Sequence, residues 1–298
     1  MLGKEEINKI VNEILDEIGT KTAVYENTVQ KARKEKSPAQ EAVQENEEKA
    51  KVIVSEGSKV TIENPEDSDA LRRMVTKTTA RIGVGKAGPR LKTQTMLKLR
   101  ADHAAARDAV FMDVSQDLIK QMGLFPVVTC CGDKNTFLTR PDLGRDFDEE
   151  TKERIKEKCT PHPDVQIIVS DGLSSSAIEA NAGRILPVVM EGLKEKGIRV
   201  GTPVFVKYGR VAAQDRISEL LDAAVVCSFI GERPGLATAE SMSAYISYKA
   251  EVGMPEARRT VVSNIHKNGV PAVEAGAYIV DLLALILEQK ASGVELKK

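Results

Sequence analysis

The stretch that decides the fold begins with the apolar run Val165-Gln166-Ile167-Ile168-Val169-Ser170 and continues into the polar turn Asp171-Gly172-Leu173-Ser174-Ser175-Ser176. Two further apolar runs end in glycine-bearing turns: Val204-Phe205-Val206-Lys207 precedes Tyr208-Gly209-Arg210-Val211, and Ala224-Val225-Val226-Cys227-Ser228-Phe229-Ile230 precedes Gly231-Glu232-Arg233-Pro234-Gly235-Leu236. Helix-like segments separate the first two pairs. Strands that alternate with helices predict an α/β fold with a mostly parallel sheet and helices over its faces.

The turns at the strand ends form the candidate site, because ligands bind outside the carboxyl ends of the strands in such sheets. The turn at Asp171 either presents backbone N–H groups to a polar ligand or only caps the next helix. Glu232 either accepts hydrogen bonds from a ligand or pairs with a nearby arginine. A fourth segment, Ser263-Asn264-Ile265-His266, ends the last expected strand, and an isolated histidine such as His266 is more often structural than catalytic.

The composition argues against several classes of protein. The chain has 298 residues and 42% hydrophobic content, so about two domains are expected at ~150 residues each. A net charge of −1 argues against a nucleic-acid-binding protein, and no apolar run reaches the ~18 residues of a membrane span. The four cysteines lack zinc-ligand spacing and no histidines pair closely, so no metal site is expected. The absence of a signal-peptide pattern predicts a cytoplasmic protein with reduced thiols.

No motif for self-contained catalysis stands out. G-x-S-x-G, H-E-x-x-H and a full P-loop are absent, so we predict no catalytic residue in this chain and expect a cofactor to carry any chemistry. The segment Gly83-Val84-Gly85-Lys86-Ala87-Gly88 matches G-x-G-x-x-G, but no buried strand precedes it and Pro89 follows it. A stand-alone NAD(P)-binding Rossmann enzyme that uses Gly83, Gly85 and Gly88 therefore remains the alternative hypothesis.

Four segments organise the chain. Residues 1–19 hold a short amphipathic helix, with apolar residues in one stripe between residues 4 and 18. Residues 20–65 form a charged linker whose composition predicts flexibility. A helical lead-in is predicted at 66–123, with helices beginning near residue 69 and spanning about 91–110. The α/β domain follows at 124–298, with helices predicted at 147–158, 175–195, 211–222 and 272–290.

Several motifs together resemble one known family, the light (small) subunit of ethanolamine ammonia-lyase. The resemblance covers about residues 70–298, in order and nearly without gaps, and rests on seven separate blocks. These blocks lie at residues 81–90 with 100–104, 138–145, 170–174, 206–211, 231–236, 263–266 and 288–293.

The resemblance implies an adenosylcobalamin-dependent lyase that converts ethanolamine to acetaldehyde and ammonia by a radical mechanism. It implies a hetero-oligomer in which a large catalytic subunit and this small subunit share base-on cobalamin, and in which this chain is inactive alone. It also implies a Rossmann-like domain at 124–298 and a lead-in at 66–123 that packs on the large subunit. The family's cobalamin contacts fall on Val211, Glu232 and Val261, where many relatives have cysteine in place of Val261. The corrin rim carries neutral amides, which suit strand-end backbone groups and a single carboxylate.

The helix at 4–18 on its charged linker resembles the encapsulation peptides of bacterial microcompartments. This implies docking on shell or core proteins of a microcompartment within the cytoplasm, which would contain volatile, reactive acetaldehyde. Two other interpretations stay open: the helix folds back on its own domain, or the chain is a non-enzymatic scaffold in which this helix is the main functional part.

Overall fold

The computed structural model describes residues 60–78 and 80–297, which divide into two compact units along the chain, Met1–Leu91 and Lys92–Lys298. Each unit is described by itself. The amphipathic helix predicted at 4–18 and most of the linker predicted at 20–65 lie outside the described residues. The boundaries predicted from the sequence at 19, 65 and 123 stay predictions.

The described part of the first unit holds one helix and one hairpin. Helix α3 (Ser68–Val75) begins after Asp67, whose side chain accepts hydrogen bonds from two backbone N–H groups of the first turn. Asp67 is therefore the N-cap of this helix, which begins close to residue 69 as predicted from the sequence. Strands β1 (Lys86–Ala87) and β2 (Arg90–Leu91) then pair in antiparallel fashion.

The second unit is built around a six-stranded sheet with the strand order β3-β5-β4-β6-β7-β8. Strands β3, β5, β4 and β6 are parallel neighbours, and β7 is antiparallel to both β6 and β8. Because β7 reverses the direction once and β8 reverses it again, β8 runs in the same direction as β6. The strands are β3 (Phe125–Val128), β4 (Val165–Ser170), β5 (Val204–Lys207), β6 (Val225–Gly231), β7 (Met242–Tyr248) and β8 (Thr260–Ile265).

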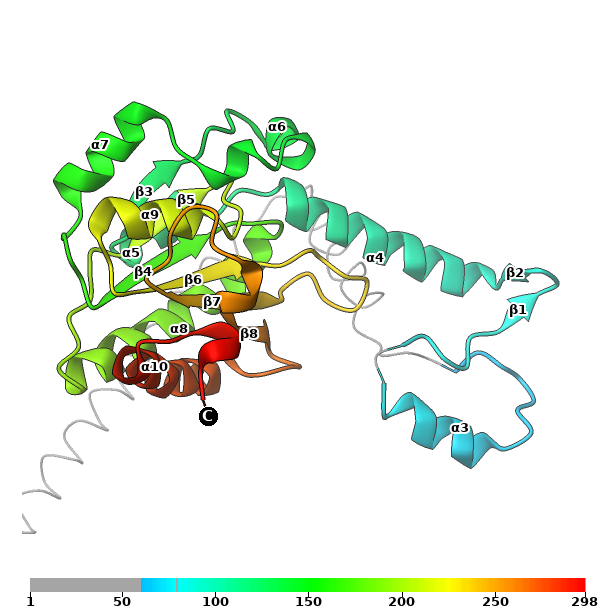
Figure 1. The fold of residues 1–298 in the computed structure, drawn as a ribbon. Helices are drawn as coiled ribbons and strands as arrows, with labels where there is room; N and C mark the ends of the chain where they lie inside the picture. Colours follow the sequence, from blue (N-terminus) through cyan, green and yellow to red (C-terminus); the bar gives the residue numbers. More distant parts are fainter. Residues whose placement is uncertain (1–59, 79, 298) are drawn as a thin grey trace, which may run out of the picture. The chain divides into compact units, whose positions relative to one another are not determined.

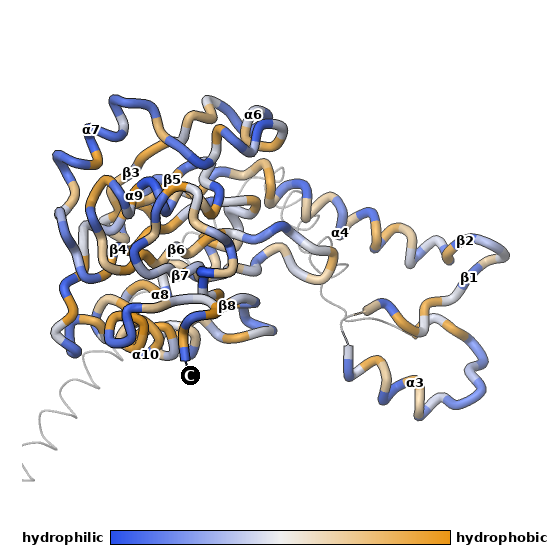
Figure 2. Tube along the Cα trace, viewed as in Figure 1, coloured by the Kyte–Doolittle hydropathy of each residue, from blue (hydrophilic) through white to orange (hydrophobic). Residues whose placement is uncertain are grey.

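Helices cover both faces of this sheet (Figure 1). One face packs on α8 and α10, and the other packs on α7 and α9. Figure 2 shows that the hydrophobic residues concentrate in the central strands and in α10. The helices of this unit are α4 (Thr93–Phe111), α5 (Gln116–Gln121), α6 (Lys134–Thr139), α7 (Glu149–Lys158), α8 (Ser175–Glu195), α9 (Ala213–Leu221) and α10 (Ala272–Gln289), with 3-10 turns η1 (Leu143–Arg145), η2 (Glu256–Arg258) and η3 (Gly293–Glu295).

The alternation read from the sequence is confirmed as an α/β fold, but the sheet is mixed. Strand β4 is buried along its whole length, as its apolar run predicts, and so is β6. Strand β7 has no counterpart among the expected strands. It lies between β6 and β8 and is antiparallel to both, so the connections from β6 to β7 and from β7 to β8 are hairpin-like and contain no α-helix.

Candidate functional site

The carboxyl ends of β4 and β5 form a topological switch point. The two strands are parallel neighbours, yet the helices that follow them, α8 and α9, lie on opposite faces of the sheet. Crevices open at such points in α/β sheets, and this is where ligands bind. The predicted turns at Asp171 and Tyr208 therefore meet at the edge where a site is expected.

Asp171 is a structural acceptor at this switch point. Its Oδ1 accepts hydrogen bonds from the backbone N–H groups of Tyr208, at 2.7 Å, and Gly209, at 3.4 Å. Burial raises the pKa of this carboxyl to about 6, although the positive charge of Lys134 opposes the shift. The two hydrogen bonds to Asp171 stabilise the turn after β5, in which Tyr208 has a positive φ of 61°.

The hydroxyl groups of the turn after β4 are used within the protein. Ser174 caps α8 by accepting a hydrogen bond from the N–H of Ala177, and its hydroxyl also contacts the carbonyl oxygen of Ala239 at 2.5 Å. Ser176 donates to the same carbonyl at 3.2 Å. The structure therefore shows the capping that was considered for this turn, while a ligand contact there stays a prediction, and the same hydroxyl groups also hold the loop between β6 and β7.

Glu232 and Val261 lie on one face of the sheet and are connected by Tyr245. Glu232 follows β6 directly, and its carboxylate Oε1 accepts a hydrogen bond of 2.8 Å from the hydroxyl of Tyr245 on β7. Val261 on β8 is the cross-strand partner of Tyr245, and its side chain is 47% exposed. Among the residues that the structure describes, Glu232 forms no ion pair with an arginine, so the internal Glu–Arg pair considered from the sequence is not observed there.

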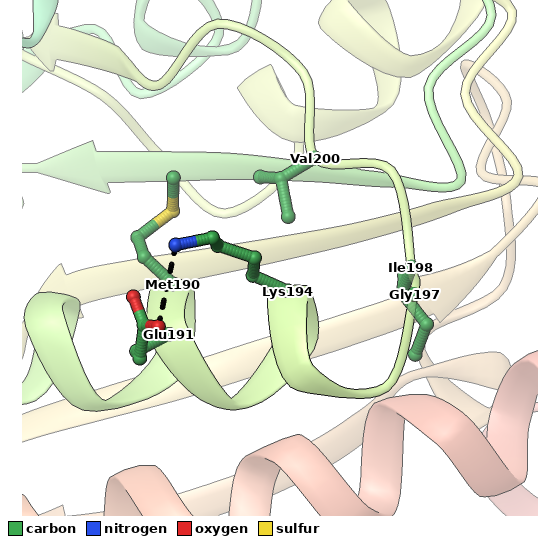
Figure 3. A pocket seen from close by; sticks show the side chains of 6 residues that line it. All are labelled: Met190, Glu191, Lys194, Gly197, Ile198 and Val200. Atoms are coloured by element: carbon green, nitrogen blue, oxygen red, sulfur yellow. Dashed lines mark hydrogen bonds and ion pairs between the residues drawn. The ribbon is translucent and has the colours of Figure 1, made fainter.

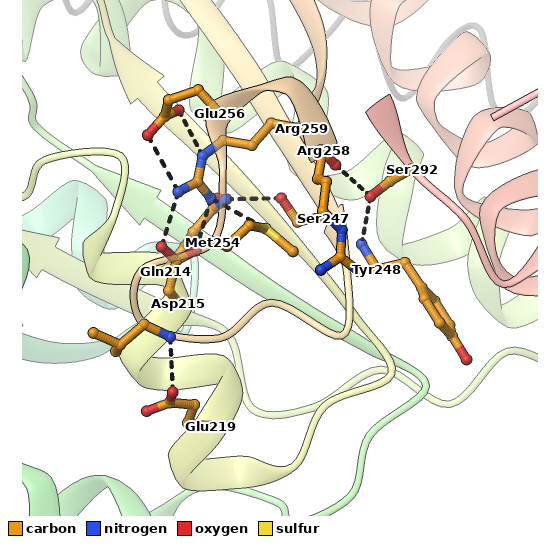
Figure 4. A network of polar contacts seen from close by, with 11 residues as sticks. Gln214, Asp215, Glu219, Ser247, Tyr248, Met254, Glu256, Arg258, Arg259 and Ser292 are labelled. Carbon is orange, nitrogen blue, oxygen red and sulfur yellow. Dashed lines mark hydrogen bonds and ion pairs between the residues drawn. The ribbon is translucent and has the colours of Figure 1, made fainter. Parts of the chain in front are cut away.

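Val211 lies in the turn that begins α9, and α9 packs on the same face of the sheet. A buried network ties this helix to the chain before β8 (Figure 4). Asp215 in the first turn of α9 forms two hydrogen bonds with Arg259, at 2.7 and 2.9 Å, and both side chains are only 2% exposed. Since Arg259 lies two residues before Val261, this ion pair fixes the turn at Val211 relative to β8.

Gln214 completes the connection between α9 and the sheet. With its amide nitrogen toward the carbonyl oxygen of Tyr245 (3.2 Å), its amide oxygen accepts from Arg259 Nη1 (2.9 Å) and from Ser247 Oγ (3.2 Å). This orientation gives every group of the amide a partner of the right kind. The roles of Tyr245, Asp215 and Arg259 could not be predicted from sequence motifs, because each of these residues bonds to a partner that is distant in the chain.

Arginine side chains give positive charge to the region of the turn after β5, which contains Arg210. Arg210 donates from Nη2 to the carbonyl oxygen of Phe137 at 2.8 Å, while its buried Nε has no acceptor among the described residues. Burial lowers the pKa of Arg210, and the nearby positive charges of Arg145 and Arg233 lower it further. An additional acceptor or anion would be stabilised here.

The G-x-G-x-x-G segment does not form a dinucleotide-binding turn. Its Lys86–Ala87 portion is strand β1, and Gly88 with Pro89 connects β1 to its antiparallel partner β2. A dinucleotide-binding motif instead follows a parallel strand and opens a helix. Gly83, Gly85 and Gly88 therefore belong to a hairpin unit, in which the N–H of Gly85 donates to Thr61 Oγ1 at 2.6 Å.

Neither of two other histidines, His266 and His103, lies among the residues of the proposed contact face. His266 is buried, its Nε2 lies 2.8 Å from Asn264 Oδ1, and its Nδ1 accepts from the N–H of Asn268. These contacts stabilise the turn after β8. His103 lies on α4 and lines a shallow hollow with Arg107 and Phe111.

A second hollow lies away from the candidate site, at the carboxyl end of α8 (Figure 3). Its lining includes Met190, Ile198 and Val200, and Val200 pairs with Val165 at the amino end of β4. The polar groups Lys194 and Glu191 form an ion pair with each other at 3.4 Å. This hollow therefore sits at the opposite end of β4 from the switch point.

The described residues place no group of three or more His, Cys, Asp or Glu side chains where they could hold a metal ion. Within the same part of the chain, no helix combines the length and the apolar character needed to cross a membrane. Cys131, Cys159 and Cys227 are buried and Cys130 is exposed. Burial raises the pKa of Cys159 to about 11, so this thiol stays protonated near neutral pH.

Comparisons with known proteins agree with the resemblance read from the motifs. The model of the family described as ethanolamine ammonia-lyase light chain (EutC) matches residues 68–297. A relative from Clostridium perfringens, named ethanolamine ammonia-lyase small subunit, is 55% identical over 271 residues, which cover 91% of this chain and 92% of the relative. Relatives of the same name are 58% identical in Clostridium tetani (79% of this chain, 80% of the relative) and 52% identical in Listeria monocytogenes (82% and 87%).

Proposed function

The chain belongs to the ethanolamine ammonia-lyase light-chain family, and from this we propose that it binds adenosylcobalamin at an interface with the large catalytic subunit. The assembled enzyme would convert ethanolamine to acetaldehyde and ammonia. The observation that carries the proposal is the face of the sheet shared by Glu232, Tyr245 and Val261, with the turn at Val211 tied to it through α9.

The groups present on this face fit the periphery of a corrin ring. The corrin rim carries primary amides, and Glu232 keeps one carboxylate oxygen that bonds to no other residue in the described part of the chain. Val261 offers an exposed apolar side chain. Many relatives have cysteine at this position, and valine in its place keeps the backbone groups that could contact the cofactor. The orphaned Nε of Arg210 and its neighbouring guanidinium groups suit the single negative charge of the cofactor, its phosphodiester.

The roles proposed for this chain are binding and orientation. The cofactor, when bound, supplies the radical chemistry, and the large subunit supplies the residues that act on ethanolamine. Val211 contributes backbone groups, Glu232 accepts from a corrin amide, and Val261 packs against the ring. The sequence lacks the D-x-H-x-x-G motif whose histidine replaces the lower base of cobalamin, so base-on binding is proposed.

A surface for the large subunit is proposed on the lead-in at 66–123. Helix α4 has 19 residues, of which Thr95 and Ala109 are buried. Leu97 is 57% exposed and Phe111 is 47% exposed on the same helix. We propose that the large subunit covers these two apolar side chains. The domain at 124–298 is then the Rossmann-like, cobalamin-binding part of the subunit, with an antiparallel pair added to its parallel strands.

The alternative of a stand-alone NAD(P) enzyme is not favoured, because the segment from Gly83 to Gly88 leads into an antiparallel hairpin and does not connect a parallel strand to a helix. A deamination assay tests the proposed function: this chain alone, a cognate large subunit alone and their mixture each receive ethanolamine and adenosylcobalamin. Activity in the mixture only is the expected result. No activity in a mixture of two folded subunits with cofactor present would contradict it.

The segment at 4–18 is proposed as an encapsulation peptide that docks on shell or core proteins of a cytoplasmic microcompartment. Its support is the apolar stripe in the sequence and the charged linker that follows. Deletion of residues 1–20 is expected to release the enzyme from the compartment and to leave the lyase activity unchanged. Loss of activity with unchanged location would refute this role.

A further inference from the structure

Tyr245 lies on the same face of the sheet as Glu232 and Val261, and helix α9, which follows the turn at Val211, packs on that face. It is a half-buried residue of β7, whose neighbours Ala244 and Ile246 point into the core beneath α8 and α10. Because side chains alternate along a strand, Tyr245 points to the other face, where α9 packs. Its cross-strand partners are Ser228 on β6 and Val261 on β8.

The hydroxyl of Tyr245 fixes one oxygen of Glu232. The bond from the phenol to Oε1 measures 2.8 Å, and it is the hydrogen bond that this carboxylate makes within the described residues. Burial raises the pKa of Tyr245, and its hydrogen bond to Glu232 raises it further, so the phenol keeps its proton and remains a donor across the physiological range. The second oxygen of Glu232 is left available for another donor.

This bond is not required to satisfy a deeply buried charge. Glu232 is half-buried, so water could hydrate its carboxylate without the tyrosine. The bond orders the carboxylate, because a free glutamate side chain loses rotamer freedom when it is fixed. A carboxylate that is already held when a ligand arrives avoids that loss at the moment of binding.

Tyr245 also contacts the elements that carry the other two positions. Its backbone pairs with Val261 across the β7–β8 ladder. Its carbonyl oxygen accepts from the amide of Gln214, which lies three residues after Val211 at the start of α9. A single residue therefore connects the three segments of the proposed contact surface.

We infer that Tyr245 is a positioning residue, which holds Glu232 so that its free carboxylate oxygen meets an amide N–H donor of the bound corrinoid. The inference rests on the proposed function, and it assigns to Tyr245 no contact with the reacting atoms. Its effect passes entirely through Glu232.

The experiment measures adenosylcobalamin binding to the complex of this chain with the large subunit, by equilibrium dialysis without ethanolamine. Four variants are compared: Tyr245→Phe, Glu232→Ala, the double variant, and Tyr248→Phe as the matched control. Tyr248 lies on the same strand but packs toward the core beneath α10. Thermal unfolding of each complex shows whether a change in affinity reflects a loss of folding.

Tyr245→Phe is expected to raise the dissociation constant about 2- to 12-fold, the usual effect of one hydrogen bond. The turnover number at saturating cofactor and the unfolding midpoint should stay close to those of the unchanged complex. The double variant should bind as weakly as Glu232→Ala alone, because the tyrosine acts only through that glutamate. Tyr248→Phe should have no effect on binding.

Three results would overturn the inference. If Glu232→Ala weakens binding and Tyr245→Phe does not, Tyr245 has no positioning role, and the proposed function survives. If the double variant is weaker than Glu232→Ala by the full factor of Tyr245→Phe, the tyrosine contacts the ligand itself. If neither single variant changes binding, the proposed cofactor contact at Glu232 fails together with the inference.

Discussion

Breaking the buried ion pair between Asp215 and Arg259 should destabilise the protein strongly. The substitution Asp215→Ala removes both short hydrogen bonds to the guanidinium group and leaves that charge in a site where the side chain is only 2% exposed. Burial alone would lower the pKa of Arg259, but its hydrogen bonds with Asp215 and Glu256 raise it above the ordinary value, so the group stays charged. Arginine cannot escape the unfavourable site by losing its proton.

The cost is expected near the lower end of the range for such substitutions. Removal of one partner of a buried pair typically costs about 3–5 kcal/mol. Glu256 still accepts from Arg259 Nε at 2.7 Å, but its own side chain is 75% exposed, so it compensates only in part. We therefore expect a loss of about 3 kcal/mol in the free energy of unfolding. Replacing both partners, Asp215→Leu with Arg259→Met, should recover part of this loss because no charge is left buried.

Urea denaturation of the full chain, followed by circular dichroism, measures these changes. Arg140 and Asp142 provide a matched control, since they form the same two-bond geometry at 3.0 and 2.7 Å with side chains 59% and 58% exposed. Asp142→Ala should leave the free energy of unfolding nearly unchanged, because exposed pairs contribute little. If Asp215→Ala has as small an effect as the control, the network does not stabilise the connection between α9 and β8.

Two further substitutions test the geometry at the switch point. Burial raises the pKa of Asp171 from 3.8 to about 6, so the folded state binds more protons than the unfolded state between these values and its stability falls as the pH rises through them. Compared with Asp171→Asn, the unchanged protein should lose roughly 3 kcal/mol of stability between about pH 4 and pH 7, measured as the difference between their urea unfolding curves; a pH-independent difference would count against the assignment. Gly172→Ala should destabilise the protein by more than Gly88→Ala, since both glycines have positive φ but only at Gly172 would a Cβ collide with the carbonyl oxygen of Gly231. Equal losses in thermal unfolding would show that the close approach of β4 and β6 is unimportant.

Much of the fold was predictable, because burial and periodicity coincide in the central strands. The apolar runs at β4, β5 and β6 and the helices α7, α8, α9 and α10 lie within a few residues of the predicted ranges. Strand β7 was not predicted from the sequence, although Met242, Ala244 and Ile246 alternate with more polar residues. Its two serines and two tyrosines carry hydroxyl groups, which weaken the apolar signal. Strand β3 is short and contains Pro126, which an edge strand tolerates and which usually argues against a strand.

The site was predictable only in part. The resemblance to the family identified Val211, Glu232 and Val261, whose role as cofactor contacts stays a prediction. The residues that hold them, Tyr245 and Arg259, have no local signature, since Arg259 pairs with a residue 44 positions away in the chain. Long-range pairs of this kind depend on strand order, which spacing along the sequence does not determine.

The most direct test of the account is a titration of adenosylcobalamin into this chain alone, into the large subunit alone, into their complex, and into the complex that carries Glu232→Ala. The account predicts that the complex binds the cofactor more tightly than either subunit. It also predicts that Glu232→Ala weakens binding to the complex about 10- to 150-fold, through loss of a hydrogen bond to a charged group. A large subunit that binds the cofactor alone as tightly as the complex does, or a complex indifferent to Glu232→Ala, would contradict a cofactor site shared with this chain.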